Sequence, residues 1–372
     1  MTQRIPAEVF PPGEFIRDEL EAREWTQSVL ADVMGRPERV VSEIISGKRS
    51  ITPDTARGLS AAFGTDPTFW INLEGAYQLS KSKHDDEQVR RRSTVYSYAP
   101  VKEMFRRGWV EATESVDVLE QRMHRFFGVS SLTEAPSFCG AAKATVAPAT
   151  TAQLAWAFRV RQIAARIVVP QYSEAALKSA ISKLRSLLSD PADAGKVPKI
   201  LASCGIRFVL VEGLASGKID GVCFWIDENS SPVVGMSLRF DRIDNFWFVL
   251  RHELEHVLRH HGQDGMMLDT DIGPDTDGVM DERELQANAA ASDFCVAKAK
   301  MDAWVARKSP FFSEMDLVGF AKTQGVHPGI VAGQLRHRIK RHNLFAKFNA
   351  KIRSALMTTA IVDGWGETYP IT

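Results

Sequence analysis

The segment FWFVLRHELEHVLRHH contains two histidines, His252 and His256, separated by a Glu-Leu-Glu triplet that begins with Glu253. Residues four apart lie one turn apart on the same face of an α-helix, so both imidazoles can bind a single Zn²⁺ ion. Glu253 then lies beside the remaining coordination position, where a carboxylate can act as a general base toward water. The spacing therefore predicts two metal ligands and one catalytic base for a hydrolytic reaction.

A third ligand is needed, because an HExxH pattern also occurs by chance in a chain with nine histidines. Glu284 lies 28 residues beyond His256 in the helical run DERELQANAAASDFCVAK, and Asn288 follows one turn later. We expect Glu284 to bind the metal and Asn288 to orient a ligand histidine. Two histidines, one glutamate and one open position are typical of a hydrolytic zinc site rather than a structural one. The alternative is an ordinary solvated helix face.

Other polar residues of this region have weaker interpretations. His260 lies about 80° around the helix from His252, so we expect it to contact substrate or solvent rather than the metal. The sequence does not assign the group that stabilises an oxyanion, for which Arg251 and His260 are the candidates. Four aspartates further on do not fit a calcium-binding loop and are expected to form a mobile acidic loop: Asp269, Asp271, Asp275 and Asp277.

The segment from about 205 to 297 resembles the ImmA/IrrE-type zinc metallopeptidases. The resemblance rests on the DNFWFVLRHELEH block, on His260 and on ERELQANAAAS, where that family has an E-x-x-A-N-x-F-A pattern. Ala290 replaces the usual phenylalanine, which affects packing rather than ligation. The resemblance implies a gluzincin-like peptidase of a kind that cuts a DNA-binding repressor. Its ligand and base positions coincide with those assigned above from spacing.

Local patterns predict the elements that hold these residues. Four amphipathic segments between 99 and 189 predict helices, and short runs rich in Val, Ile, Phe and Trp between 205 and 240 predict three strands in an antiparallel meander. Helix resumes from 242 to about 353, apart from an acidic loop at 262–283. The expected fold class is α+β, mostly α, with a small antiparallel sheet packed against the HExxH helix. The expected domains are 1–80 for a DNA-binding unit, 81–98 for a charged connector and 99–372 for a peptidase domain with helical N- and C-terminal extensions.

Residues 1–80 are expected to form five short capped helices, since helix-starting Thr, Asp and Pro alternate with helix-ending Gly. The second and third helices are joined by the turn Gly35-Arg36, which is the spacing of a helix-turn-helix. With the apolar side of the third helix buried, its outward face and the following loop offer polar side chains to DNA. The expected contacts are Gln27, Glu38, Arg39, Ser42, Lys48 and Arg49.

This N-terminal segment resembles the HigA-type antitoxin branch of the XRE helix-turn-helix family over nearly 75 residues. Pro37 departs from the Ser or Thr that commonly opens the recognition helix in that family. Residues 1–80 also hold eight Lys and Arg against twelve Asp and Glu, so attraction to phosphates must be local. The alternative is a dimerisation or partner-binding module.

The C-terminal run FAKTQGVHPGIVAGQLRHRIKRHNLFAKF resembles a segment found behind the peptidase in fused proteins of this group. Its cationic side chains are expected to form a solvated helix face, with a basic face near the cleft as the alternative: His327, Arg336, His337, Arg338, Lys340 and Arg341.

The whole composition limits the remaining possibilities. Lys and Arg total 46, as do Asp and Glu, and no run of about 18 apolar residues or secretion signal occurs. Four cysteines without a CxxC pair predict buried thiols in a reducing compartment. We therefore expect a cytoplasmic protein that does not contact membranes.

These observations predict an antitoxin-like transcriptional regulator whose zinc-dependent endopeptidase domain cuts a partner repressor or itself. The expected partners are operator DNA, a protein substrate or toxin, and a second copy of the chain in a homodimer. The alternative is a DNA-binding antitoxin or ligand-sensing regulator whose zincin-like domain is non-catalytic.

Overall fold

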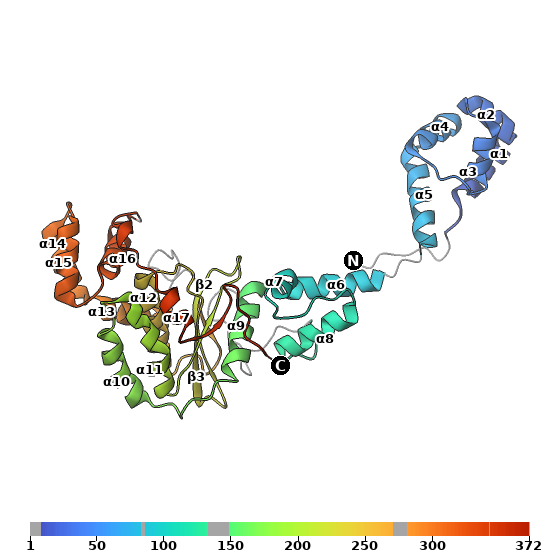
Figure 1. The fold of residues 1–372 in the computed structure, drawn as a ribbon. Coiled ribbons are helices and arrows are strands. Elements are labelled where there is room, and N and C mark those ends of the chain that lie inside the picture. Colours follow the sequence, from blue (N-terminus) through green and yellow to red (C-terminus); the bar gives the residue numbers. More distant parts are fainter. Residues whose placement is uncertain (1–8, 83–85, 133–148, 271–280, 342, 372) are drawn as a thin grey trace. The chain divides into compact units, whose positions relative to one another are not determined.

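The computed structural model describes residues 9–82, 86–132, 149–270, 281–341 and 343–371. The chain divides into two compact units, Met1–Glu87 and Gln88–Thr372 (Figure 1). Each unit has its own hydrophobic core. The predicted connector, 81–98, falls on the end of one helix and on a further helix, α6 (Asp86–Tyr98).

The described part of the first unit consists of five helices, as the sequence predicts. They are α1 (Pro12–Ala22), α2 (Gln27–Met34), α3 (Glu38–Ile45), α4 (Pro53–Phe63) and α5 (Pro67–Lys81). Side-chain caps start three of them. Thr26 accepts a hydrogen bond from the Val29 amide at 3.2 Å, and Thr52 and Asp66 cap α4 and α5 in the same way.

The apolar faces of these helices share one core, which includes Ile16, Leu30, Val41 and Trp70. Helix α1 crosses α3 so closely that a Cβ atom on Gly13 would lie 2.0 Å from the carbonyl oxygen at the end of α3. Only glycine permits this approach, which fixes α3 against the rest of the unit.

The second unit combines helices before and after a small sheet. Before the sheet lie α6, α7 (Val101–Arg106), α8 (Val116–Phe127), α9 (Thr151–Ala164), α10 (Glu174–Arg185), the 3₁₀ turn η1 (Pro191–Lys196) and α11 (Val197–Ser203). After its third strand come α12 (Ile243–Leu258), α13 (Glu282–Cys295), α14 (Lys298–Lys308), α15 (Glu314–Gln324), α16 (Pro328–Ile339), η2 (Ala346–Phe348) and α17 (Arg353–Met357).

The described sheet has five strands, β1 (Arg207–Val211), β2 (Ile219–Ile226), β3 (Ser231–Met236), β4 (Met267–Thr270) and β5 (Ile361–Asp363), in the order β4-β2-β3-β1-β5. The α+β class is confirmed, but the predicted antiparallel meander is wrong. Strand β1 pairs in parallel with β3 and with β5, while β2 pairs antiparallel with β3 and β4. Strands β1 and β2 are consecutive in the sequence, but β3 lies between them in the sheet. This order depends on tertiary packing and cannot be read from the local sequence pattern.

Helices cover both faces of the sheet, and strand residues alternate between them. Val209 and Phe224 pack on the side of α9, whereas Leu210 and Trp225 pack on the side of α11 and α12. Figure 1 shows α9 on one side of the strands and α10, α11 and α12 on the other. Helix α12 is therefore sandwiched between the sheet and further helices.

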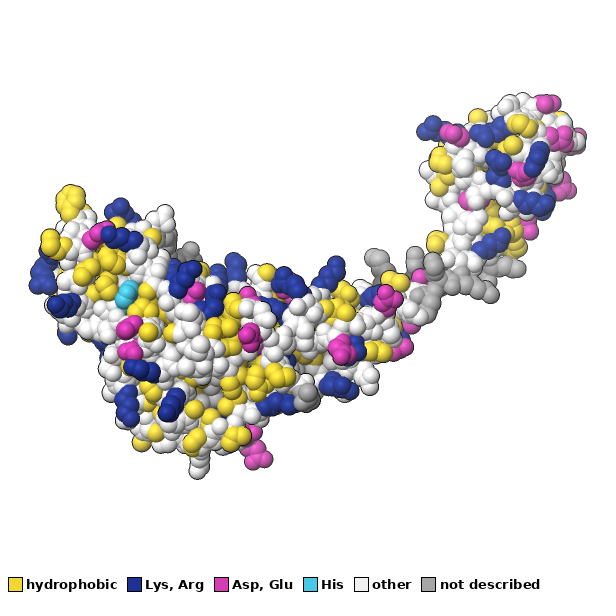
Figure 2. Space-filling view, viewed as in Figure 1, with side chains coloured by type: hydrophobic (Ala, Val, Ile, Leu, Met, Phe, Trp, Pro, Cys, Tyr) yellow, Lys and Arg dark blue, Asp and Glu magenta, His cyan; other side chains and the backbone are white. Residues whose placement is uncertain are grey.

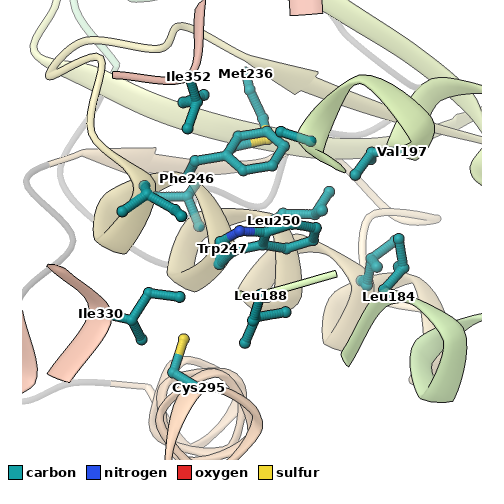
Figure 3. Close-up of a cluster of buried hydrophobic side chains, with 14 of the residues drawn as sticks. Leu184, Leu188, Val197, Met236, Phe246, Trp247, Leu250, Cys295, Ile330 and Ile352 are labelled. Atoms are coloured by element: carbon teal, nitrogen blue, oxygen red, sulfur yellow. The ribbon is translucent and has the colours of Figure 1, made fainter. Parts of the chain in front are cut away.

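Helix α12 is anchored by large apolar side chains. Figure 3 shows Phe246, Trp247 and Leu250 of α12 inside the buried cluster. The same cluster contains side chains of α10, α13 and α16, namely Leu184, Cys295 and Ile330. Burial on several sides holds α12 rigidly at the position where its polar residues face the sheet.

Two buried ion pairs connect the C-terminal elements to the rest of the second unit. Arg336 of α16 donates to Asp244 of α12 at 2.9 Å and is 4% exposed, so the expectation of a solvated face is wrong for this residue. Arg159 of α9 donates to Asp363 of β5 at 2.9 Å, with both side chains buried. Each pair joins segments far apart in the sequence.

Cys204, Cys223 and Cys295 are buried free thiols, as expected, and Cys139 lies outside the described residues. Among the described helices, none has the length and apolar character required to cross a membrane.

Candidate metal centre

Helix α12 carries the first two candidate ligands. His252 and His256 are fully buried, and their Nε2 atoms lie 3.0 Å apart. One helical turn separates the residues, so both rings leave the same face of the helix. The gap between the two nitrogens cannot hold two protons, so at least one of them accepts a shared proton or binds a metal.

Helix α13 brings Glu284 to the same point. Its Oε2 atom lies 3.2 Å from the Nε2 atom of His252, and its Oε1 atom lies 3.5 Å from that of His256. Ala287 and Ala291 of α13 are fully buried, and these small side chains let α13 pack closely against α12. The structure therefore brings together the three ligands that the sequence proposes.

The Nδ1 atoms of the two imidazoles have hydrogen-bond partners on the side away from the cluster. His252 Nδ1 lies 3.1 Å from the Oδ1 atom of Asn288, to which it donates when Nε2 is the free nitrogen. His256 Nδ1 lies 2.9 Å from Nδ1 of His261, a residue that the sequence analysis did not single out. Burial, and then the neighbouring His256, lower the pKa of His261 to about 4. The neutral ring of His261 can therefore accept a hydrogen bond, which leaves both Nε2 atoms facing inward.

His260 lies outside this cluster, because α12 ends two residues earlier. Its φ angle of 56° reverses the chain, and its ring stacks on Trp225 with centroids 5.3 Å apart. His260 Nε2 is also 3.5 Å from a carboxylate oxygen of Glu174. After this reversal the amide of His261 donates to the carbonyl of His256 at 2.9 Å, which brings the next imidazole under the helix end.

Strand β4 supplies a fourth donor that the sequence analysis missed. Asp269 is 5% exposed, and its Oδ2 atom lies 3.1 Å from His252 Nε2 and 4.0 Å from His256 Nε2. The prediction that Asp269 belongs to a mobile acidic loop is therefore wrong, because the residue pairs with Gly221 in the sheet. The other aspartates of that prediction lie outside the described residues: Asp271, Asp275 and Asp277.

The geometry of the four side chains fits a zinc ion. His252, His256, Asp269 and Glu284 each offer a ligand atom, and these atoms all lie within 4.8 Å of one another. The His252–His256, His252–Asp269 and Glu284 separations of 3.0 to 3.5 Å compare with about 3.3 Å between ligands of a tetrahedral site with zinc bonds of 2.0 to 2.1 Å, while Asp269 lies 4.0 Å from His256. Imidazole nitrogen and carboxylate oxygen are also ligand types that zinc accepts.

The charge of this cluster also favours a cation. Burial alone would lower the pKa of His252, but the carboxylate of Asp269 and then that of Glu284 raise it to about 10. Burial opposes ionisation of Glu284 too, yet hydrogen bonds from His252 and His256 lower its pKa. Without a metal, a proton on His252 supplies the positive charge that these carboxylates require.

Glu253 lies buried beside the four donors. No donor in the described part of the chain reaches either of its carboxylate oxygens. A Cβ atom on Gly221 of β2 would lie only 1.9 Å from Glu253 Oε1, so the absent side chain at this position makes room for the carboxyl group. Burial, and then the negative charge of Asp269, raise the pKa of Glu253 well above its ordinary value.

The two candidates for oxyanion stabilisation have other partners. Arg251 donates to Glu255 at 2.7 Å, and His260 stacks on Trp225.

The helix-turn-helix unit presents the expected polar face. Val41, Ile44 and Ile45 of α3 are buried, while the residues proposed to contact DNA lie on the other side and on the following turn. Of the proposed contacts, Gln27 is half-buried at the start of α2 and five are exposed: Glu38, Arg39, Ser42, Lys48 and Arg49.

Two of the exposed cations are paired with one carboxylate. Arg39 Nε donates to Glu43 at 2.8 Å, and Arg49 Nε donates to the other oxygen of Glu43 at 3.1 Å. These hydrogen bonds, that from Arg39 first, lower the pKa of Glu43. Figure 2 shows basic and acidic side chains interspersed over the visible face of this unit. Glu43 therefore offsets part of the positive charge that Arg39 and Arg49 present on this face.

Two family models match the chain. Residues 16–70 match the helix-turn-helix model, and residues 205–310 match the model described as an IrrE N-terminal-like domain, peptidase M78. The second range contains β1 to β4, α12 and α13, and hence all four donors of the candidate metal centre.

Similar proteins cover the first unit. Antitoxin HigA-1 of Vibrio cholerae is 35% identical over 89 residues, which are 23% of this chain and 81% of the relative. Virulence-associated protein I of Dichelobacter nodosus is 33% identical over 79 residues, 21% of this chain and 73% of the relative. A solved structure, Pseudomonas aeruginosa antitoxin HigA with higBA promoter, has 32% identity, covers 20% of this chain and 82% of that chain, and gives a TM-score of 0.20.

The two units thus define a helix-turn-helix protein whose second unit contains an IrrE N-terminal-like domain. The chain belongs to the XRE-type helix-turn-helix family through its first unit, which has HigA-like relatives, and it carries an IrrE/ImmA-like M78 domain in its second.

Proposed function

We propose that the second unit is a zinc-dependent endopeptidase and that the first unit binds operator DNA. The chain would then be an antitoxin-like regulator that hydrolyses a peptide bond in a partner repressor or in itself. The convergence of His252, His256 and Glu284 on one point, with Glu253 buried beside them, carries the peptidase proposal. The match to the IrrE N-terminal-like domain supports it.

Each polar group near the cluster has a role in this proposal. The two inward-facing imidazoles and Glu284 hold the metal, while Asn288 and His261 keep the imidazole rings oriented through Nδ1. Zinc, when bound there, supplies a Lewis acid for the scissile carbonyl group. Glu253 takes the proton of the attacking water and passes it to the leaving amine.

A substitution of the proposed base tests the peptidase function. Zinc-loaded full-length protein is incubated with a peptide library prepared from a bacterial proteome, and new N-termini are identified by mass spectrometry. Intact mass of the protein itself reports self-cleavage. We expect Glu253→Gln to retain zinc but to lose cleavage, whereas Glu282→Gln, an exposed change of the same charge on α13, keeps both. Cleavage by Glu253→Gln at the parental rate would contradict the base assignment.

The DNA-binding proposal is supported by the helix-turn-helix match and by the exposed polar face of α3. Fluorescence anisotropy with promoter fragments measures it. Lys48→Ala, at a proposed phosphate contact, should weaken binding to all sequences alike and reduce the salt slope by about one. A change limited to one sequence would contradict that role. The expected homodimer and toxin partner stay predictions, which mass photometry and co-purification can test.

One observation favours a second candidate function, in which the zincin-like domain is non-catalytic and the chain is a DNA-binding antitoxin or ligand-sensing regulator. Asp269 gives the cluster four protein donors, and four protein ligands are typical of structural zinc sites. Stoichiometric zinc, together with operator binding and the absence of cleavage products from every variant, would favour this candidate.

A further inference from the structure

We propose that Asp269 is a fourth, displaceable ligand of the metal, which closes the active site in the resting protein. The proposal rests on the proposed zinc-dependent function and assigns a regulatory residue to the same metal centre. The chain would then be a peptidase with low resting activity that rises when Asp269 leaves the metal.

The first observation is where the carboxylate lies. A hydrolytic zinc site uses three protein ligands and keeps the fourth position for water or substrate. Asp269 Oδ2 is 3.1 Å from His252 Nε2, as close as the Glu284 oxygen at 3.2 Å, so it occupies the fourth position of the same cluster. This oxygen makes no hydrogen bond of normal geometry with a described residue, although it is buried. A buried carboxylate oxygen in that situation has a metal ion as its natural partner.

The second observation is that the sheet register determines this placement. Asp269 lies opposite Gly221, and opposed residues of an antiparallel pair project to the same face. That face is the side of α12, since a Cβ at Gly221 would meet Glu253. Along β4, Met267 packs with the α12 side and Leu268 with the α9 side, which puts Asp269 back on the α12 side. The backbone pairing of β4 with β2 therefore directs the Asp269 side chain toward the cluster, whichever rotamer it adopts.

The third observation is how differently the four donors are held. His252, His256 and Glu284 come from two helices that pack closely against each other, and α12 is buried on several sides. Strand β4 is four residues long and pairs, among the described strands, only with β2. Its register with β2 is irregular between Ile219 and Gly221. A short edge strand with one partner opens at lower free energy than packed helices do, so Asp269 is the donor that can leave.

The fourth observation links Asp269 to the base. Asp269 lies opposite Gly221 in the sheet, and Glu253 Oε1 lies directly in front of the same glycine, so the two carboxyl groups are neighbours. A single side chain thus takes the coordination position and lies beside the group that would activate water. Withdrawal of β4 by a few ångströms would expose both at once, with a substrate carbonyl oxygen taking the place of Asp269 Oδ2.

Cobalt substitution tests the proposal without any need for a substrate. The absorption spectrum of Co²⁺ in the full-length protein reports its ligands, and acetohydroxamic acid serves as a small probe for an open position. We expect the parent spectrum to resist the probe at millimolar concentration, whereas Asp269→Ala and the size-matched Asp269→Asn change colour with it. Zinc affinity, from competition with a chromophoric chelator, should fall by about 10- to 100-fold in Asp269→Ala. Asp264→Ala, an exposed aspartate before the same strand, should behave like the parent.

The outcomes separate this inference from the proposed function. If the parent binds the probe as readily as Asp269→Ala does, Asp269 is not a ligand. The metal centre itself would still be supported if His256→Ala no longer binds the metal. If the probe and affinity results hold but neither the parent nor Asp269→Ala cleaves peptides, the closed site stands and the peptidase proposal fails. Faster cleavage by Asp269→Ala that Glu253→Gln abolishes in the double variant would support both.

Discussion

Substitution of Gly221 by alanine tests the packing around the proposed base. The new Cβ atom would lie 1.9 Å from Glu253 Oε1 and 2.8 Å from its Cδ, distances that real Cβ contacts do not show. Glu253 is fully buried, so its carboxyl group must move by about 1 Å or more into space that is already filled. Overpacking of this kind costs roughly 1 to 3 kcal/mol. In a unit of this size that corresponds to a fall of about 2 to 10 °C in Tm.

A double-mutant cycle isolates the contact from other effects of the substitution. Glu253→Ala removes the atoms that the new methyl group would meet, so Gly221→Ala should cost little in that background. The expected coupling free energy is roughly 1 to 3 kcal/mol. Scanning calorimetry of the full-length protein with a chelator present measures it without a contribution from metal affinity. Gly213→Ala is the matched control, because its Cβ would lie 3.6 Å from Ser237, an ordinary contact.

One result would refute this reasoning. If Gly221→Ala lowers stability equally in both backgrounds, to within about 0.5 kcal/mol, Glu253 does not fill the space in front of Gly221. The base would then lie elsewhere in the folded protein.

Further predictions address other parts of the molecule. Asp363→Ala leaves the buried Arg159 guanidinium without its carboxylate, so urea unfolding should show a loss of about 3 to 5 kcal/mol, more than for Asp363→Asn. Glu43→Gln frees two arginines and should tighten binding to a mixed-sequence DNA duplex about two- to fivefold in low salt by anisotropy; unchanged affinity would exclude competition by Glu43. Burial lowers the pKa of His327 below 6.5, so the unfolded chain binds this proton more tightly. The stability that the neutral His327 contributes is thus present above pH 6.5 and is lost as the pH falls below it. The urea midpoint of His327→Asn should therefore depend less on pH between 5 and 7 than that of the parent protein. Metal removal should lower the calorimetric transition of the second unit alone.

The sequence predicts most helices, and it predicts the three side chains that converge at the candidate metal centre, because both depend on local periodicity. The i,i+4 spacing of His252 and His256 fixes their common face whatever the tertiary structure. Glu284 could be placed near the two histidines because α13 has a helical pattern of its own and alanines that allow close packing. Capping residues such as Thr26 likewise mark helix starts in the first unit.

Features that depend on long-range pairing escape the same approach. Asp269 follows two methionines and a leucine, an apolar run whose strand character is weak beside so many aspartates. Only the pairing of β4 with β2 turns that carboxylate inward. His261 reaches His256 because His260 takes a left-handed backbone conformation. The sequence gives no signal for this turn, since position 260 is neither glycine nor proline. The parallel pairing of β1 depends on β5, three residues more than 140 positions away.

The pairing of β1 with β5 has a consequence for the order in which the protein folds. The helices of the first unit contact near neighbours in sequence, a topology that folds quickly. The second unit completes its sheet only when Asp363 meets Arg159 across 204 positions, and loop closure of that length slows folding. During synthesis the N-terminal unit should therefore be folded while the β5 side of β1 is still unpaired. In that interval chaperones can bind the exposed strand edge.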